Sequence, residues 1–280
     1  MAGRDHHFRR NSRCFAVRFL DRLRTKLDWN SDLGTFNLRH MPRFCFIIPC
    51  YNEADRLDTP AFSGFIQEHA DVDFWFVNDG STDHTEEVLN ALSRMHPNRI
   101  GVVSQSPNKG KAEAVRIGML LATDQPYDYI GFMDADLATP LSQIKLFQQV
   151  LAERPETNIV LGSRIQRLGA RIERRAVRHY VGRIFATLAS EILHLPVYDT
   201  QCGAKLFSRS CVATLFSQPF SSRWIFDVEL LARYVSQIGT QGLIEVPLLE
   251  WYERGGSKIR LRHLVRLPIE LWKIRQQMNL

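Results

Sequence analysis

The chain has 280 residues, of which 45% are hydrophobic and 24% are charged, with a formal net charge of +6. These proportions are typical of a folded globular protein and exclude a disordered or fibrous one. Its apolar runs, such as Phe44 to Cys50, are far shorter than the roughly 20 residues of a membrane-spanning helix. No apolar segment with a cleavage site follows the basic N-terminus, so we expect no secretory signal and a cytoplasmic location. The five cysteines lack CxxC spacing and predict neither a zinc site nor a disulfide framework.

The positive charge is concentrated in three segments. Residues 1–43 have ten basic and four acidic side chains, and residues 160–183 and 254–280 each have seven basic and one acidic. Each segment therefore carries +6, and the remainder of the chain carries −12. An acidic body with basic segments suits an enzyme that binds a cation and contacts an anionic surface. The alternative is that the basic segments are helix faces in contact with water.

Short apolar runs alternate with helical patterns from Phe44 onward. Each run has the length of a buried strand, and helical segments such as Thr82 to Met95 and Ala112 to Ala122 lie between the runs. This alternation predicts an α/β fold, with a Rossmann-like, mostly parallel sheet and helices on both faces. The predicted strands are 44–48, 74–77, 100–104, 129–133 and 159–162.

The sharpest motif is Asp134-Ala135-Asp136, directly after the fourth predicted strand. Ligands of such sheets bind outside the carboxyl ends of the strands, so polar clusters that follow different strands should meet in one crevice. Two carboxylates on one turn can bind a hard divalent cation together with a phosphate ligand, and Mg²⁺ or Mn²⁺ prefers these oxygen donors. A D-x-D pair also occurs by chance in loops, and its position after a strand favours the metal site.

Further polar clusters follow other predicted strands. Asp79 could accept a hydrogen bond from the ring N–H of uracil or guanine, and Tyr51 could pack on a base or ribose. Asn108 to Lys111 opens a helix with free N–H groups and two lysines, which favours an anionic ligand. Each cluster alone could equally be a strand-ending turn or a solvated helix start.

Taken together and in this order, Ile-Pro-Cys-Tyr-Asn-Glu, Val-Asn-Asp-Gly-Ser-Thr-Asp, Asn-Lys-Gly-Lys and Asp-Ala-Asp resemble the family 2 glycosyltransferases of GT-A fold. Later segments, among them Asp199 to Phe207 and Trp224 to Glu229, are similar to the dolichyl-phosphate/polyprenyl-phosphate glucosyltransferase branch. The resemblance implies a GT-A domain over residues 43–258. A basic N-terminal arm (1–42) and a basic amphipathic C-terminal tail (259–280) would flank it.

The resemblance also implies roles for individual residues. The nucleotide-sugar would contact Pro49, Tyr51, Glu53, Asp79, Lys111, Asp134 and Ala135. The metal would be bound by Asp134 and Asp136, which form the expected catalytic group together with Asp227 and Glu229. The acceptor and its phosphate would contact Arg164, Gln201, Gly203 and Lys205.

The implied reaction is transfer of a sugar, with inversion, from a nucleotide donor to a lipid phosphate. The branch favours glucose from UDP-glucose, and a UDP-sugar over a GDP-sugar. A phosphate acceptor is already anionic and needs no strong general base, whereas a hydroxyl acceptor would need Asp227 or Glu229. The chain departs from the family at Asn78, where the nucleoside loop usually has a first aspartate, so only the contribution of Asp79 is retained.

The predicted C-terminal tail, residues 259–280, indicates whether the enzyme would contact a membrane. The chain lacks the C-terminal membrane helices of some relatives, so membrane contact would be peripheral, at the inner face of the membrane. Apolar residues such as Leu271 and Trp272 alternate with arginines and lysines, as in an interfacial amphipathic helix that is broken at Pro268. The alternative is a helix packed on the body with its basic residues in water.

Several other functions remain open. The acceptor could be a non-lipid glycan, or the protein could be a catalytically inactive, membrane-associated nucleotide-binding protein. A nucleotidyltransferase or a dehydrogenase is disfavoured because no glycine-rich signature follows the first predicted strand. The basic stretches lack an aromatic RNA-binding signature, so no nucleic-acid partner is expected.

Overall fold

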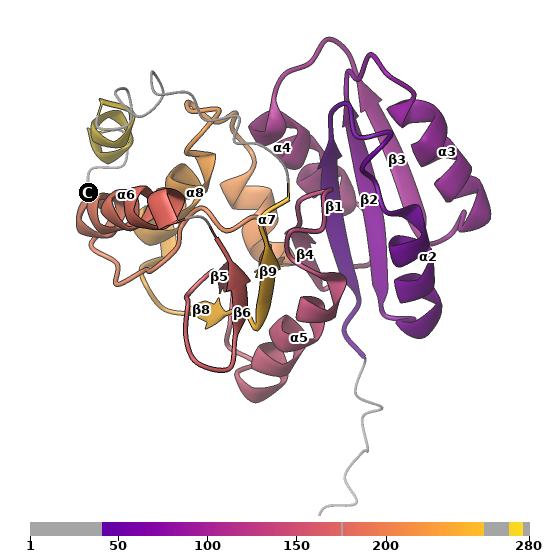
Figure 1. The fold of residues 1–280 in the computed structure, drawn as a ribbon. Helices are drawn as coiled ribbons and strands as arrows, with labels where there is room; N and C mark the ends of the chain where they lie inside the picture. The colour runs from indigo at the N-terminus through magenta and orange to yellow at the C-terminus, as the bar shows by residue number, and fades with distance from the viewer. Residues whose placement is uncertain (1–40, 175, 255–268, 277–280) are drawn as a thin grey trace, which may run out of the picture. The chain divides into compact units, whose positions relative to one another are not determined.

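The computed structural model describes residues 41–174, 176–254 and 269–276 (Figure 1). All five predicted strands are present in a seven-stranded sheet with the order β3-β2-β1-β4-β7-β5-β8. Its strands are β1 (Phe44–Cys50), β2 (Val72–Asp79), β3 (Ile100–Gln105), β4 (Tyr129–Phe132), β5 (Ile159–Ser163), β7 (Lys205–Ser208) and β8 (Leu243–Pro247). A second sheet pairs β6 (Arg171–Glu173) with β9 (Glu250–Tyr252). Residues 1–40 of the predicted arm and residues 259–268 and 277–280 of the tail lie outside the described residues, so the predicted domain boundaries stay predictions.

The direction of the strands determines which residues reach the functional edge. β1 pairs in parallel with β2 and β4, β2 with β3, and β5 with β8. β7 lies between β4 and β5 and is antiparallel to both. The carboxyl ends of β1 to β5 therefore share one edge with the amino end of β7, and the segment just before β7 reaches that edge from the opposite direction.

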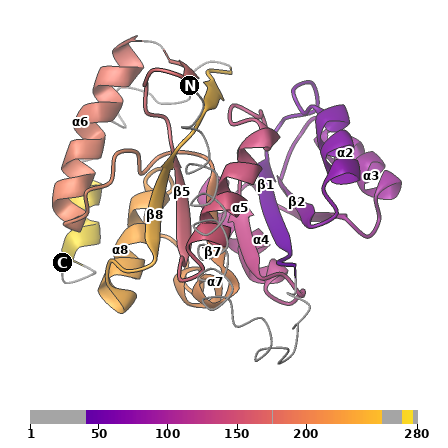
Figure 2. The ribbon, with the colours of Figure 1, turned by 90° about the horizontal axis from the view of Figure 1, so that it is seen from below.

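Helices cover both faces of the sheet (Figure 2). The buried side chains of α2 (Thr59–Glu68), α3 (Thr85–Met95) and α5 (Ile144–Glu153) belong to one apolar cluster. Those of α4 (Lys111–Ala122), α6 (Ala176–Leu193), α7 (Arg209–Leu215) and α8 (Phe226–Ile238) belong to the other. Burial of each large side chain contributes about 1.5–3 kcal/mol, so the two clusters hold the edge loops on a rigid base. The predicted sheet with helices on both faces is confirmed.

The aromatic side chains explain why the two clusters hold together. Phe62 of α2 meets Phe74 of β2 edge to face at 5.1 Å between ring centroids. On the other face, Phe132 of β4 stacks on Phe207 of β7 at 6.1 Å. Both geometries are favourable for aromatic pairs and add to the burial of the rings.

Two element boundaries differ from the sequence-based expectation. α3 begins at Thr85 and not at Thr82, because the Asp83 side chain accepts hydrogen bonds from the backbone N–H and the hydroxyl of Thr85 and forms a turn before the helix. β1 continues through Pro49 to Cys50. Beyond Ile47 it pairs only with β2, so the missing N–H of proline breaks no ladder to β4.

The last described segment, residues 269–276, is helical. Its Leu271 and Ile274 are buried in the same apolar cluster as α6 and α8, whereas Trp272 is exposed. This part of the predicted tail packs on the body through one face. Figures 1 and 2 both place it, in yellow, beside α6. No helix within the described ranges combines the length and apolar character that crossing a bilayer requires.

Candidate active site

The turns after β1 and β2 are bound to each other at the carboxyl edge of the sheet. The backbone N–H of Asn52 donates to the Ser81 hydroxyl at 3.0 Å, and that of Glu53 to the Thr85 hydroxyl at 2.8 Å. The Asn52 side chain in turn accepts from the Thr82 N–H at 2.9 Å. The predicted nucleoside residue Tyr51 lies on this double turn, half-exposed, so its ring is accessible to a ligand.

Asp79, at the end of β2, organises the following loop. Its carboxylate accepts hydrogen bonds from the backbone N–H groups of Lys109 and Gly110, both at 2.8 Å, and from the Gln105 side chain. Asp79 is 3% exposed, so it is already enclosed by these partners. Gly80 has φ +65°, and a methyl group at this position would lie 2.8 Å from the Asn108 nitrogen. The structure thus gives Asp79 a part in shaping the loop, and its contact with a base stays a prediction.

Asp134 and Asp136 lie on the turn that leaves β4, with Ala135 buried between them. Asp134 forms an ion pair with Lys111, the first residue of α4. Asp136 accepts a hydrogen bond from the Ala138 N–H at 3.0 Å. Burial and then the negative charge of Asp134 raise the pKa of Asp136, as expected for two carboxylates that share one pocket.

The Asp134–Asp136 pair fits a divalent cation of the Mg²⁺ or Mn²⁺ type. Within the described ranges no cluster of three or more histidine, cysteine or acidic side chains could hold a metal by itself. Mg²⁺ commonly takes one or two carboxylates and completes its shell with water and substrate phosphates. A cation beside Asp136 would also offset the repulsion that raises its pKa.

The segment before β7 meets the acid pair because β7 is antiparallel. Gly203 lies so close to Asp134 that a methyl group at this position would be 2.0 Å from the Asp134 Oδ2 atom. Gln201 belongs to the same segment, and its Nε2 atom is buried with no hydrogen-bond partner among the described residues. The structure therefore brings Gly203, a predicted acceptor residue, into contact with a predicted metal ligand.

Lys205, the first residue of β7, is completely buried and does not face solvent. Its ammonium group donates to Asp227 Oδ1 and to the Cys202 carbonyl oxygen, both at 2.6 Å. Asp227 lies in the first turn of α8. Desolvation acts to lower the pKa of Lys111, but the charges of Asp134 and then Asp227, with the hydrogen bond to Asp134, raise it overall. Lys205 therefore holds Asp227 near the acid pair. Contact between Lys205 and an acceptor phosphate, predicted from sequence, would require this ion pair to open.

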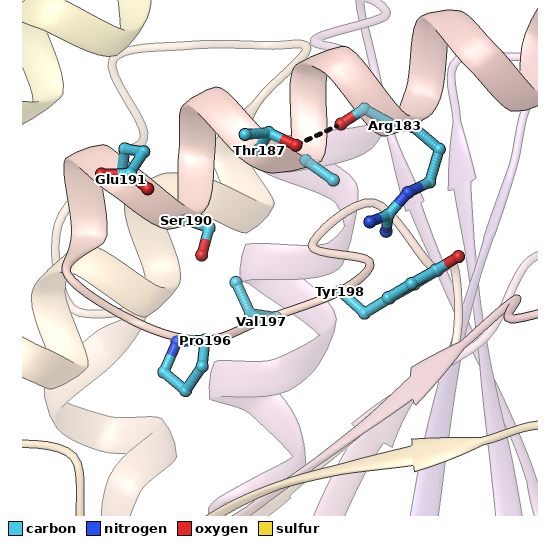
Figure 3. A pocket seen from close by; sticks show the side chains of 8 residues that line it. Arg183, Thr187, Ser190, Glu191, Pro196, Val197 and Tyr198 are labelled. Carbon is cyan, nitrogen blue, oxygen red and sulfur yellow. Dashed lines mark hydrogen bonds between the residues drawn. The ribbon is translucent and has the colours of Figure 1, made fainter.

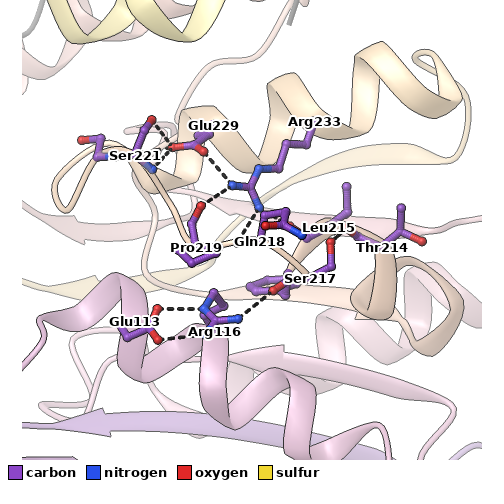
Figure 4. A network of polar contacts seen from close by, with 12 residues as sticks. Glu113, Arg116, Thr214, Leu215, Ser217, Gln218, Pro219, Ser221, Glu229 and Arg233 are labelled. Atoms are coloured by element: carbon purple, nitrogen blue, oxygen red, sulfur yellow. Dashed lines mark hydrogen bonds and ion pairs between the residues drawn. The ribbon is translucent and has the colours of Figure 1, made fainter. Parts of the chain in front are cut away.

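Glu229 occupies a different environment from Asp227 although only two positions separate them. Its carboxylate accepts from Arg233 at 2.7 Å and from the N–H and hydroxyl of Ser221 at 2.9 and 2.8 Å (Figure 4). Arg233 also donates to the backbone carbonyl oxygens of Leu215, Gln218 and Pro219. Both oxygens of Glu229 thus help to anchor the loop between α7 and α8, which favours a structural role, and its expected role as a general base for a hydroxyl acceptor stays a prediction.

Arg164 follows β5 and is bound to a partner that the sequence did not reveal. Its guanidinium donates to both carboxylate oxygens of Asp199, at 2.6 and 2.8 Å, and lies over the Trp251 ring at 5.3 Å. Burial alone would raise the pKa of Asp199, but the charge and hydrogen bonds of Arg164 lower it to about 2. Arg164 lies at the predicted edge, yet its charge is balanced by Asp199 and not by an open site.

A small pocket lies beside Asp199, between α6 and residues 196–198 (Figure 3). Its volume is about 170 Å³, and Arg183 of α6 stacks over the Tyr198 ring at 3.6 Å to the centroid. The backbone N–H groups of Tyr198 and Asp199 both donate to Glu245 of β8. These contacts fix the segment that carries Asp199 and Gln201. The sequence motifs did not reveal that Asp199 contacts both Arg164 and Glu245, because these contacts join distant positions.

Comparison with known proteins agrees with this geometry. The family model for Glycosyl transferase family 2 matches residues 45–216. The chain is 33% identical over 242 residues to a dolichyl-phosphate beta-glucosyltransferase of Trichomonas vaginalis, covering 82% of this chain and 69% of that protein. It is 30% identical over 234 residues to the dolichyl-phosphate beta-glucosyltransferase of Saccharomyces cerevisiae, with 77% and 68% covered.

Solved structures show the same fold. One is glucosyl-3-phosphoglycerate synthase from Mycobacterium tuberculosis in complex with Mn²⁺, uridine diphosphate and glucosyl-3-phosphoglycerate. It has a TM-score of 0.61 and 19% identity over 85% of this chain and 80% of that one. The predicted GT-A fold is confirmed. With the family match over more than half of its length, the chain belongs to the family 2 glycosyltransferases.

Proposed function

We propose that the protein transfers glucose, with inversion, from UDP-glucose to a dolichyl-phosphate or other polyprenyl-phosphate lipid. One observation carries the proposal: Asp134 and Asp136 lie at the carboxyl edge of the sheet together with Lys111, Gly203 and Asp227. The names of the relatives support glucose as the sugar and dolichyl phosphate as the acceptor. The solved synthase, which is in complex with uridine diphosphate and Mn²⁺, supports the choice of nucleotide and metal.

On this proposal, the donor lies along the turns that follow β1, β2 and β4. Tyr51 packs on the base or ribose, with Pro49 and Glu53 beside it, and the diphosphate lies toward Lys111. Asp134 and Asp136 hold Mg²⁺ or Mn²⁺, and the bound cation would neutralise charge on the departing diphosphate. Pre-positioned charges of this kind lower the barrier without reorganisation during the reaction.

The acceptor reaches the donor from the side of β7 and α8. A phosphate oxygen of the lipid attacks the anomeric carbon, a new carbon–oxygen bond forms, and the bond to the nucleoside diphosphate breaks on the opposite face. The phosphate is already anionic, so no strong general base is needed. Asp227 Oδ1 lies 2.6 Å from the Lys205 Nζ atom. On this proposal Asp227 contributes to the reaction through its fixed position and its negative charge, and not as a base.

Calorimetry of UDP and GDP in the presence of Mn²⁺ tests the donor site. We expect the wild type to bind UDP in preference to GDP, and Asp136→Asn to lose the metal-dependent part of the binding. Asp124→Asn is the matched control because Asp124 is exposed at the end of α4. Equal binding by Asp136→Asn and the wild type would contradict the assignment of the metal site.

Transfer of labelled glucose tests the acceptor. We expect the label from UDP-glucose to enter an organic-solvent-extractable product when a short-chain polyprenyl phosphate is supplied. Label that enters only a water-soluble glycan would support the non-lipid alternative. Binding of UDP without any transfer would support an inactive nucleotide-binding protein.

The surface of α6 supports contact with a membrane. Tyr180, Ile184 and Leu188 recur every four residues and are exposed, whereas Ala186 and Ala189 on the opposite side are buried. A helix that is apolar on both sides leaves one apolar face in water, and an outward tyrosine suits a membrane interface. The surrounding sequence 160–183 carries a charge of +6, which favours anionic lipids. We therefore assign peripheral membrane contact to this face.

Liposome binding tests this assignment. We expect Ile184→Glu to reduce sedimentation with vesicles that contain anionic lipid, while transfer to a detergent-solubilised acceptor is retained. Leu121→Glu is the matched control, because Leu121 is also an exposed aliphatic residue on a helix but lies on α4. Equal sedimentation of Ile184→Glu and the wild type would contradict membrane contact through α6.

A further inference from the structure

The loop between α7 and α8 carries a basic residue, Arg223, to which none of the sequence motifs assigned a role. This loop is the segment that Glu229 and Arg233 anchor from within α8. Arg223 is exposed, and no described residue forms an ion pair with its guanidinium. A role for Arg223 toward the nucleotide-sugar donor rests on the proposed function, because that function supplies the donor.

The backbone on both sides of Arg223 is fixed by a serine hydroxyl. Ser222 Oγ accepts hydrogen bonds from the N–H groups of Trp224 and Ile225, at 3.2 and 3.1 Å, and donates to Glu270 Oε2 at 2.5 Å. One donated and two accepted bonds use the full capacity of a hydroxyl group. Ser222 is 5% exposed, so this arrangement is protected from water. Arg223 therefore extends from a pre-organised backbone.

The side chain of Arg223 lies against the loop that opens α4. A methyl group on Gly110 would lie 3.7 Å from the Arg223 Cδ atom, which is ordinary van der Waals contact. Gly110 precedes Lys111, whose ammonium group forms an ion pair with Asp134. The aliphatic part of the Arg223 side chain therefore lies beside the loop that leads into Lys111 and the predicted diphosphate site.

The nearby basic residues differ in whether their charge is already balanced. Lys111 faces Asp134, Lys205 faces Asp227 and Arg164 faces Asp199. Arg223, by contrast, has no carboxylate partner among the residues that the structure describes, although its backbone is fixed. An exposed guanidinium on a fixed backbone, beside the loop that opens α4 and without a carboxylate partner among the described residues, is available to an anionic group of the substrate.

We propose that Arg223 binds the diphosphate of the nucleotide-sugar donor and stabilises it as it departs. Guanidinium groups match phosphate oxygens with two parallel hydrogen bonds, which an ammonium group cannot reproduce. Contact with the diphosphate from the α8 side complements the metal site on the β4 side. The anchor between Ser222 and Glu270 then makes the helix at 269–276 a support for donor binding.

Calorimetric titration of UDP into the protein, with Mn²⁺ present, tests the proposal on the full chain. We expect Arg223→Gln to weaken UDP binding by about ten- to hundredfold, because a hydrogen bond to a charged group is lost. Arg223→Lys should recover part of the affinity. Arg94→Gln, an exposed arginine in the last turn of α3, is the matched control and should bind as the wild type does.

The outcomes separate this inference from the proposed function. If the wild type and Arg223→Gln bind UDP equally, the inference is overturned while the donor site stands, even when the KM for a lipid acceptor changes. If the wild type itself fails to bind UDP, the inference and the proposed donor fall together. If Arg223→Gln has the same thermal unfolding temperature as the wild type, its loss of affinity is not the result of a folding defect.

Discussion

The functional side chains in the two halves of the sheet lie in different environments. In the half built on β1 to β4, Tyr51 and Lys111 are accessible, and hydrogen bonds from backbone N–H groups to side-chain oxygens hold the turns together. In the half built on β5, β7 and α8, the charged residues among the predicted acceptor and catalytic residues are buried in ion pairs. These pairs are Arg164–Asp199, Lys205–Asp227 and Glu229–Arg233.

This difference predicts how substitutions in each half affect the stability of the fold. On the donor side, side-chain oxygens such as those of Asp79 and Ser81 accept hydrogen bonds from backbone N–H groups, so loss of one of these side chains leaves no buried cation unpaired. A buried ion pair contributes little in net stability, but removal of one partner leaves an uncompensated charge. We therefore expect substitutions on the acceptor side to act through stability as well as through chemistry.

The largest expected effect comes from Gly203→Ala, at the contact between the two halves. The added methyl group would lie 2.0 Å from Asp134 Oδ2, so Asp134 or the segment before β7 must move. A displacement of about 1 Å in an active site can cost roughly a hundredfold in rate, and we expect at least this loss in kcat. Gly64→Ala is the control, because no atom lies within 4 Å of the added group in α2. Activity of Gly203→Ala near the wild-type level would show that the contact is not critical.

Glu229→Gln distinguishes an anchor from a catalytic base. It removes the charge opposite buried Arg233, and we expect the free energy of unfolding to fall by about 3 kcal/mol, as measured by urea denaturation. Activity per folded molecule should stay close to that of the wild type, because both Glu229 oxygens face the anchored loop. A variant with wild-type stability and no turnover would restore Glu229 as a catalytic residue.

Asp199 gives the acceptor side a distinct dependence of stability on pH. The folded-state pKa of Asp199, about 2, lies below its ordinary value of 3.8. Its contribution to the free energy of unfolding is therefore fully present above pH 3.8 and is lost as the pH falls through 2. The shift corresponds to about 2 kcal/mol at neutral pH. We expect Asp199→Asn to be less stable than the wild type by this amount at pH 7. The difference should shrink between pH 4 and pH 2, and a constant difference would contradict the Arg164 pairing.

Much of the fold and of the donor side could be predicted from sequence because local patterns determine them. Apolar runs fix the strands, and the parallel direction of β1, β2, β3 and β4 brings their following turns to one edge. That rule alone places Asp134, Asp136 and Lys111 together. The exact start of α3 depends on the Asp83 turn, which propensity alone does not reveal.

The acceptor side could not be predicted to the same depth, because its contacts join residues far apart in sequence. Arg164 and Asp199 are 35 positions apart, and Lys205 and Asp227 are 22 apart. Sequence motifs indicated that these residues matter but not which carboxylate each cation meets. They also did not separate Asp227 from Glu229, whose side chains leave the first turn of α8 toward different partners.

The smallest expected effect comes from substitution of Asn52, which tests how much its backbone conformation stabilises the turn after β1. This residue has φ +54°, a left-handed conformation that asparagine tolerates and alanine does not, and its side chain accepts from the Thr82 N–H. Asn52→Ala should lose both the hydrogen bond and the favourable conformation, while Asn52→Gly loses only the hydrogen bond. We therefore expect the alanine variant to be less stable than the glycine variant by about 1 kcal/mol in urea denaturation. Equal stabilities would mean that the turn after β1 is held by its side-chain contacts, as on the acceptor side, and not by its backbone.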